Sequence, residues 1–188
     1  MDELTFVLRV FLGTLFISTS VAKFRKPQEH MLTVKEYRIL SSFLLYPFAR
    51  AEMIVEFLTG ILLFLGMFQK TVALLAVFLL AIYSLAIVVN LLRGRKEISC
   101  GCGGAAGDHP ISWFLVLRNF LLIGMGICLY LNPTPWGSIE AIWNGEANQL
   151  FNLLVLQDIL IAWLFLLMFA MTVDLRNLYK RFKRFLQS

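Results

Sequence analysis

Charged side chains are scarce in this chain. Asp, Glu, Lys and Arg make up only 15% of its 188 residues, whereas 59% of the residues are hydrophobic. Water-soluble domains carry about 25% charged residues, so this composition excludes an ordinary soluble fold. Cysteine is scarce as well, and three thiols exclude a scaffold held together by several disulfides.

Long apolar runs take up most of the sequence. A helix needs about 20 mostly apolar residues to cross the bilayer core, and five stretches satisfy this requirement: 4–23, 48–68, 70–92, 110–131 and 148–172. The first stretch follows acidic residues instead of a basic n-region, so we interpret it as a retained helix and not as a signal peptide. The sequence therefore predicts an all-α, polytopic membrane bundle in one domain over residues 1–188, with a four-helix core and a fifth transmembrane helix.

Positive charges are distributed unevenly over the connections between these runs. Fourteen of the 17 Lys and Arg residues flank the first connection, the third connection and the C-terminal tail, whereas Lys70 alone lies in the opposite set. Because cytoplasmic loops carry the excess of basic residues, we expect a multi-pass protein of the cell (inner) membrane. Its N-terminus would lie outside, and the cysteine-containing loop and the C-terminus would be cytoplasmic. The net charge of +5 then indicates contact with anionic lipid and not with nucleic acid.

Two of the cysteines, Cys100 and Cys102, lie one residue apart in the polar stretch ISCGCGGAAGDHPISW, residues 98–113. A disulfide between them requires a sharp turn of the chain, and Gly101 permits such a turn. A ring this small is strained, which favours a reversible disulfide over a structural one. Basic residues within 93–96 and the start of the following helix are expected to favour the thiolate.

Other interpretations of the cysteines stay open. They could be loop residues without a role of their own, or they could bind a soft metal together with His109, although a fourth ligand is not evident. Cys128 lies about 25 Å further along the fourth predicted helix, at 1.5 Å per residue, and is expected to be a small packing residue.

Several segments carry a resemblance to a known family. They are LRVFLGTLFISTSVAKF near the start, EFLTGILLFLG from Glu56, and RGRKEISCGCGG followed by ISWFLVLRN. Together they resemble the MauE (methylamine-utilisation E) family of redox-associated membrane proteins, within the broader DoxX-like group, over about residues 5–131. The extra loop, fifth helix and basic amphipathic tail at 132–188 lie outside the resemblance.

The resemblance implies a function as well as a fold. The family is associated with disulfide formation and with maturation of exported proteins, often beside a thioredoxin-like partner. We therefore expect a thioredoxin-like protein or a thiol substrate protein as the partner of this chain. Its bundle looks like that of vitamin K epoxide reductase relatives. By resemblance, Cys100 and Cys102 are the redox pair.

Charged residues inside the predicted helices form two sets at matched depths. Such charges are costly in lipid and usually face one another or a cavity. At 1.5 Å per residue, Arg118 and Glu56 both lie about 12 Å from the cysteine side, and Arg9 and Asp158 both lie about 21 Å from it. We therefore expect Arg118 to contact Glu56, or Glu52 one turn earlier, at the floor of a cavity that opens towards the cysteines. Arg9 and Asp158 are expected to form a structural pair.

Taken together, these features predict a membrane thiol–disulfide oxidoreductase. Cys100 and Cys102 would cycle between dithiol and disulfide, and a quinone or a thioredoxin-like protein would complete the circuit. Lys23, which ends the first helix on the same side, is expected to help hold a thiolate. The alternatives are a non-enzymatic assembly or scaffold subunit, in which the cysteines are dispensable, and soft-metal binding at the cysteine loop.

Overall fold

The computed structural model describes residues 2–39, 41–107, 109–140 and 153–186, and over these ranges the chain is mostly helical, without a β-strand. Its elements are α1 (Asp2–Arg25), α2 (Pro27–Glu36), α3 (Ser42–Leu65), α4 (Gln69–Leu92), the short 3-10 helix η1 (Gly104–Ala106), α5 (Trp113–Leu131) and α7 (Leu153–Leu186). Helices α1, α4, α5 and α7 are long and apolar enough to cross a membrane. The predicted all-α membrane bundle is confirmed.

Helix α3 differs from the predicted second span at 48–68. It begins earlier, at Ser42, and it is as long as α1 and α4, but its three charged residues, Arg50, Glu52 and Glu56, set it apart from the four helices that are long and apolar enough to cross a membrane. Both glutamates are buried. Because its carboxylates face the interior, α3 can pack in the bundle without exposing them to lipid.

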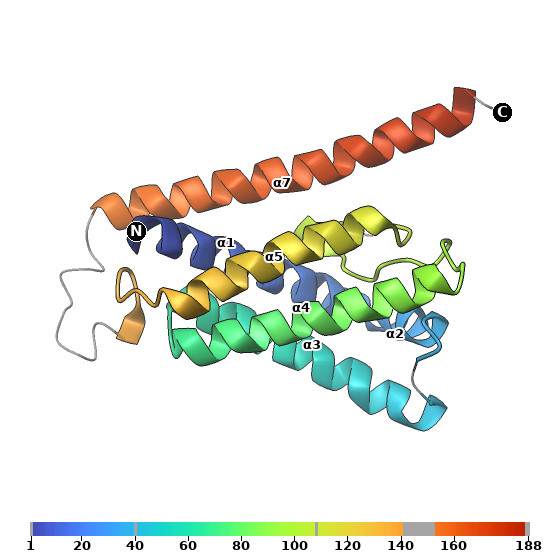
Figure 1. The fold of residues 1–188 in the computed structure, drawn as a ribbon, viewed down its shortest axis with the longest axis horizontal. Helices are drawn as coiled ribbons and strands as arrows, with labels where there is room; N and C mark the ends of the chain where they lie inside the picture. Colours follow the sequence, from blue (N-terminus) through green and yellow to red (C-terminus); the bar gives the residue numbers. More distant parts are fainter. Residues whose placement is uncertain (1, 40, 108, 141–152, 187–188) are drawn as a thin grey trace.

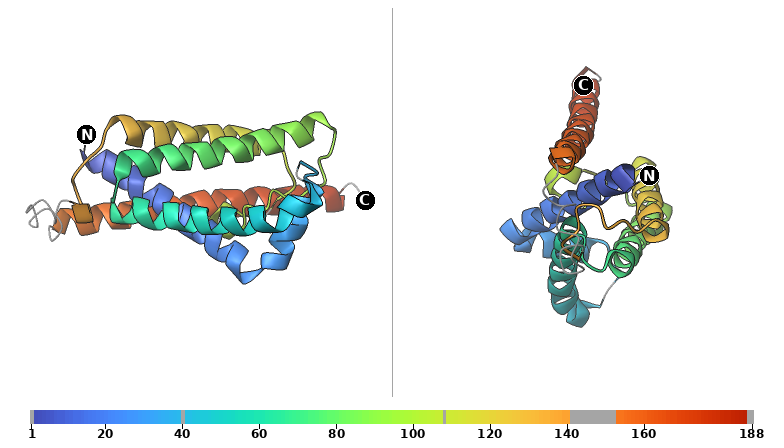
Figure 2. Two further views of the ribbon diagram at one scale, coloured as in Figure 1. Left: turned by 90° about the horizontal axis from the view of Figure 1, so that it is seen from below. Right: turned by 90° about the vertical axis from the view of Figure 1, so that its left-hand side faces the viewer.

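Four helices form a group, and α7 lies on its outside. Helices α1, α3, α4 and α5 pack together, and α7 runs along this group and continues past it (Figure 1). Seen end on, α7 stands to one side (Figure 2). In the most apolar window of α1, 61% of the residues are buried, against 17% in α7, so α1 is the central helix and α7 the peripheral one.

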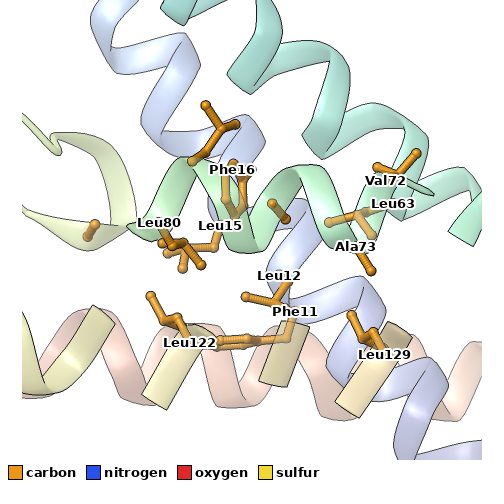
Figure 3. Packing of buried hydrophobic residues seen from close by; sticks show 13 residues of the cluster. Phe11, Leu12, Leu15, Phe16, Leu63, Val72, Ala73, Leu80, Leu122 and Leu129 are labelled. Atoms are coloured by element: carbon orange, nitrogen blue, oxygen red, sulfur yellow. The ribbon is translucent and has the colours of Figure 1, made fainter. Parts of the chain in front are cut away.

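The core is built around α1. Its apolar side chains pack between those of the other helices of the group (Figure 3). The labelled members of this cluster are Phe11, Leu12, Leu15 and Phe16 of α1, Leu63 of α3, Val72, Ala73 and Leu80 of α4, and Leu122 and Leu129 of α5.

Helices α1 and α3 approach each other closely because glycines lie at their crossing. A Cβ on Gly13 would lie 2.9 Å from the backbone nitrogen of Phe64, and a Cβ on Gly60 would lie 2.8 Å from that of Ile17. Small residues at such crossings are typical of membrane helix pairs, since they let the backbones touch. The close approach also brings the polar side chains of the two helices within hydrogen-bond distance further along.

The two ends of the bundle hold different segments. Helix α2, the loop between α4 and α5, and the C-terminal end of α7 lie at one end, whereas the N-terminus and the segment after α5 lie at the other (Figure 1). The predicted charge asymmetry requires that the first connection, the cysteine loop and the C-terminal tail lie on the same side, and this arrangement is present. Which end faces the cytoplasm stays a prediction.

The predicted helix at 110–131 begins three residues later, at Trp113, with Ser112 as its N-cap. The residues before it pair with the start of the cysteine loop instead. The backbone N–H of Cys100 donates to the carbonyl of His109 at 2.7 Å, and the N–H of Ile111 donates to that of Ile98 at 2.9 Å. This short antiparallel pairing closes the base of the cysteine loop.

Candidate functional site

The cysteine loop borders an internal cavity of about 280 Å³. Most of the wall is apolar and comes from α1, α3, α4 and α5, with Phe16, Leu80 and Leu122 among its residues. A smaller set of titratable side chains lines the same cavity: Lys23, His30, Tyr37, Glu52, Glu56, Tyr83, Cys100, Cys102 and Arg118. The structure thus brings every predicted supporting residue to one cavity, together with Gly101.

Glycines and a serine hold the cysteine loop against α1. Gly104 has a φ of +53°, and a Cβ at this position would collide with the backbone carbonyl of Ser18 in α1. The N–H of Ala105 donates to the Ser18 hydroxyl oxygen at 2.9 Å. The loop therefore rests directly on the central helix, which fixes the position of the sulfur atoms beside the cavity.

Cys100 and Cys102 are both free thiols and lie against each other. Gly101, with a φ of +67°, makes the turn between them. The turn lets the backbone N–H of Cys102 donate to Cys100 Sγ at 3.1 Å, and the two thiols also form a hydrogen bond. The chain therefore adopts, in the dithiol form, the sharp turn that a disulfide between these cysteines requires.

Arg118 of α5 binds the cysteine loop. Its Nη2 donates to Cys102 Sγ at 3.3 Å and its Nη1 donates to the carbonyl of Ala106 at 2.8 Å. The predicted contact with Glu56 or Glu52 is wrong, because another cation occupies both carboxylates. Arg118 faces the sulfur itself.

Lys23 is that cation. Its Nζ lies 2.5 Å from Glu52 Oε1 and 2.6 Å from Glu56 Oε2, and all three side chains are more than nine-tenths buried. Glu52 and Glu56 lie one turn apart on the same face of α3, so one ammonium group at the end of α1 reaches both. Lys23, which was expected to help hold a thiolate, thus takes the place beside the two glutamates that was expected of Arg118.

Three further residues complete this cluster, and sequence reasoning missed them. His30 Nε2 lies 2.5 Å from Glu52 Oε2, the Tyr83 hydroxyl donates to Glu52 Oε1 at 2.5 Å, and the Thr19 hydroxyl donates to Glu56 Oε1 at 2.7 Å. The sequence could have indicated two of the three. The Tyr83 hydroxyl lies inside an apolar run and needs a hydrogen-bond partner, and Thr19 precedes Lys23 by one helical turn and so lies on the same face of α1. His30 lies in the first connection, whose path the sequence does not determine.

Arg9 and Asp158 were predicted to form a pair, but they do not contact each other. Arg9 Nη2 donates to the carbonyl oxygens of Trp136 at 3.1 Å and Gly137 at 2.7 Å, whereas Asp158 Oδ2 accepts a hydrogen bond from Trp136 Nε1 at 3.3 Å. The segment after α5 folds between the two charged residues, and its carbonyl groups replace the carboxylate as partners of Arg9. This cluster lies away from the cysteines and joins α1, α7 and the connecting segment.

The two thiols differ in acidity. The hydrogen bond from Cys100 is the main cause that lowers the pKa of Cys102, and the positive charges of Arg118 and Lys23 lower it further, to about 6, against the opposing effect of burial. The same hydrogen bond, together with burial, raises the pKa of Cys100 well above its ordinary value. The cations that matter come from two helices and not from the basic lead-in at 93–96. At neutral pH, Cys102 is therefore a thiolate beside a protonated Cys100.

This arrangement suits thiol–disulfide exchange better than metal binding. A thiolate next to a second thiol provides an attacking sulfur and a resolving sulfur. In the part of the chain that the structure describes, no three residues among His, Cys, Asp and Glu are grouped so as to hold a metal ion. The soft-metal alternative with His109 thus has no ligand set there.

The part of the chain that matches known proteins is the part that contains the cavity. Residues 1–132 match the family model described as methylamine utilisation protein MauE, and every cavity residue lies within this range. The methylamine utilization protein MauE of Paracoccus denitrificans is 32% identical over 122 residues, which are 65% of this chain and 66% of that protein. Those of Methylophilus methylotrophus and Methylorubrum extorquens are 32% and 31% identical over 67% and 70% of this chain, and over 66% and 71% of their own lengths. The chain thus spans just under two thirds of the length of the first two relatives. No solved structure matches it.

Proposed function

The chain belongs to the methylamine utilisation protein MauE family, and we propose that it acts as a membrane thiol–disulfide oxidoreductase through Cys100 and Cys102. The observation that carries this proposal is the contact between Cys102 Sγ and the buried Arg118 guanidinium, with Cys100 adjacent. A cation held against a sulfur atom favours its thiolate, which is the form that attacks disulfides. A loop cysteine without a role would gain nothing from a buried arginine.

The exchange takes two steps. The Cys102 thiolate attacks one sulfur of a partner disulfide, which forms a mixed disulfide and releases the first partner thiolate. Cys100 then loses its proton to that thiolate and attacks Cys102 Sγ, which closes the Cys100–Cys102 bond and releases the second partner thiolate, protonated by solvent. Two electrons pass from the cysteine pair to the partner, and the same steps in reverse oxidise a partner dithiol.

The surrounding residues have separate roles in this scheme. Gly101 allows the turn that closes the ring, and Arg118 stabilises the attacking thiolate. Lys23 adds positive potential near Cys102, while Glu52 and Glu56 balance its charge and hold it at the end of α1.

The setting we propose is the cell (inner) membrane, with the cysteine loop on the cytoplasmic side. A thioredoxin-like protein on that side, or a quinone in the membrane, then exchanges electrons with the pair. In this setting the protein assists the maturation of exported proteins only indirectly, through its partner. The relatives are named for methylamine utilisation, so the pathway in which this chemistry serves is proposed to be the same.

Trapping of the mixed disulfide tests the proposal. In a Cys128→Ser background, full-length Cys100→Ser protein exposed to glutathione disulfide is expected to accumulate glutathione on Cys102, because the resolving thiol is missing. Cys102→Ser should react at least tenfold more slowly, and the protein with both cysteines should form the internal disulfide instead.

Equal reaction rates for the two single variants would contradict the assigned roles. Failure of the intact pair to form its disulfide would leave the scaffold alternative in place.

A further inference from the structure

The cavity beside the cysteine loop is comparable in size to a small-molecule site. Its volume of about 280 Å³ approaches the usual lower size of small-molecule sites, about 300 Å³. Cys100 and Cys102 border it, and most of the remaining wall is apolar. A folded protein cannot enter a space of this size between helices, whereas a small apolar molecule can.

Two residues that line this cavity carry buried polar atoms without a hydrogen-bond partner. They are Nδ1 of His30 and Nε of Arg118, and both side chains are more than nine-tenths buried. Buried polar atoms are normally satisfied, so an unpaired one in a cavity wall indicates a polar group of a bound molecule. The expected occupant is therefore mostly apolar and has polar atoms that can both accept and donate hydrogen bonds.

We propose that the cavity binds a lipid-soluble quinone, which oxidises the Cys100–Cys102 dithiol. This inference rests on the proposed thiol–disulfide chemistry and names its electron acceptor. A quinone is a mostly apolar molecule whose carbonyl oxygens accept hydrogen bonds and whose reduced hydroxyl groups donate them. It takes up two electrons and two protons, the same numbers that a dithiol releases when it forms a disulfide.

The reaction balances with groups on the cavity wall. The two sulfur atoms form one S–S bond and give two electrons to the quinone ring. One proton comes from the Cys100 thiol. The other is taken from solvent through His30 and replaces the proton that Cys102 released when it became a thiolate. The products are the Cys100–Cys102 disulfide and a hydroquinone.

His30 can serve both states of the quinone. Its Nε2 is held by Glu52, which leaves Nδ1 to face the ligand. A protonated ring donates from Nδ1 to a quinone carbonyl, and after the proton has moved the neutral ring accepts from the hydroquinone hydroxyl. The thiol exchange with a protein partner does not use His30, and the quinone site gives this histidine a role.

Two apolar side chains of the cavity lining are also partly exposed. Ile39 and Phe48, near the start of α3, are 50% and 38% exposed. We expect the apolar tail of the quinone to leave the cavity beside them.

The test uses the purified full-length protein in detergent with decylubiquinone as the probe. Ala86 lines the cavity and Ala81 lies on the exposed side of the same helix, α4, so Ala86→Phe and Ala81→Phe form a matched pair. Decylubiquinone is expected to oxidise the dithiol of the wild type with one hydroquinone formed per disulfide. Ala86→Phe should slow this oxidation at least tenfold and leave the equilibrium of the pair with glutathione unchanged, whereas Ala81→Phe should behave as the wild type.

His30→Ala provides a second variant that does not crowd the core. It should slow oxidation by decylubiquinone several-fold more than it slows the reaction with glutathione disulfide. An excess of decanol, which has an apolar tail but no redox group, should not compete.

Several results would overturn the inference. A dithiol that glutathione titrates normally and decylubiquinone leaves untouched would end the quinone site, and so would a wild-type rate for both phenylalanine variants. Either result leaves the proposed function standing. Full competition by decanol would show an ordinary lipid site. A pair that forms no disulfide even with glutathione would end both proposals.

Discussion

At the scale of single residues, the acidity of Cys102 is the property from which the chemistry follows. Its thiolate is stabilised by the Cys100 thiol and by two cations, Arg118 and Lys23. Only the thiolate reacts with alkylating reagents. The pH at which alkylation reaches half its maximal rate therefore measures how far the surrounding groups lower the pKa of Cys102.

We expect Cys102 in a Cys100→Ser, Cys128→Ser protein to be alkylated by iodoacetamide with a midpoint near its pKa of about 6. The serine hydroxyl can replace the hydrogen bond that Cys100 donates. The rate should rise as the pH increases through the midpoint and be level above about pH 7.5, where an ordinary thiol of pKa about 8.5 is still mostly protonated. Stopped-flow or mass-spectrometric rates between pH 5 and 9 supply the profile.

Arg118→Ala should move this midpoint upward, because it removes the positive charge and the hydrogen bond to Cys102 Sγ. Arg50→Ala is the matched control, since Arg50 is exposed on α3 and stacks on Tyr46. A midpoint that does not move in Arg118→Ala would contradict the role given to this arginine.

Sequence reasoning located these residues but assigned the wrong partners. The spacing of Cys100 and Cys102 and the charge of Arg118 inside an apolar run pointed to one site, and the structure places them there. Depth along a helix axis follows from counting residues, but the direction of each side chain around that axis does not. For this reason Arg118 was expected to meet Glu56, whereas Lys23 meets both glutamates.

At the scale of elements, the contact of α1 with α3 depends on buried charge as well as on the glycine crossing. Lys23 binds both glutamates of α3, and Glu52 also holds α2 through His30 and α4 through Tyr83. One cluster thus links four helices around the cavity. Removal of its single ammonium group would leave two uncompensated carboxylates.

Lys23→Met is therefore expected to lower the free energy of unfolding by about 3–5 kcal/mol, the usual cost of breaking a buried ion pair. Lys26→Met is the matched control, because the Lys26 contact with Glu29 is two-thirds exposed and contributes little. Unfolding in mixed micelles of increasing denaturing detergent supplies the measurement. Adding Glu52→Gln and Glu56→Gln to Lys23→Met should recover part of the loss; equal effects of Lys23→Met and Lys26→Met would contradict the cluster's role.

The elements themselves were largely predictable, and the exceptions have local causes. Apolar runs of sufficient length gave α1, α4 and α5, because length and composition alone determine that a segment can cross lipid. The start of α5 was placed too early because Pro110 resembles a first-turn proline, whereas the pairing of Ser99 with Pro110 holds it in the loop. Such tertiary pairing leaves no periodic signal in the sequence.

At the scale of the whole molecule, the bundle separates two polar clusters. The segment after α5, to which Arg9 donates hydrogen bonds, lies at one end, and the cysteine loop between α4 and α5 lies at the other (Figure 1). Helix α7 crosses the outside of the group with many exposed apolar side chains, among them Trp163 and Leu167. Exposed apolar side chains on a spanning helix suit contact with lipid.

The charge asymmetry predicts how this molecule is oriented. Engineered cysteines at Glu140, an exposed position after α5, and at Ser188, in the tail, are expected to differ in intact cells: a membrane-impermeant maleimide should label the first and not the second. Labelling after permeabilisation controls for accessibility of the tail. Labelling of the tail from outside would reverse the orientation and place Cys100 and Cys102 on the outer side.

A redox titration of Cys100 and Cys102 tests the central claim most directly. Full-length Cys128→Ser protein is equilibrated in glutathione buffers of defined potential, and the fraction of disulfide is read by differential alkylation. The account predicts a reversible two-electron transition at a potential above about −300 mV, where structural disulfides are not reduced. A pair that stays reduced in every buffer, or a disulfide that none of them reduces, would contradict it.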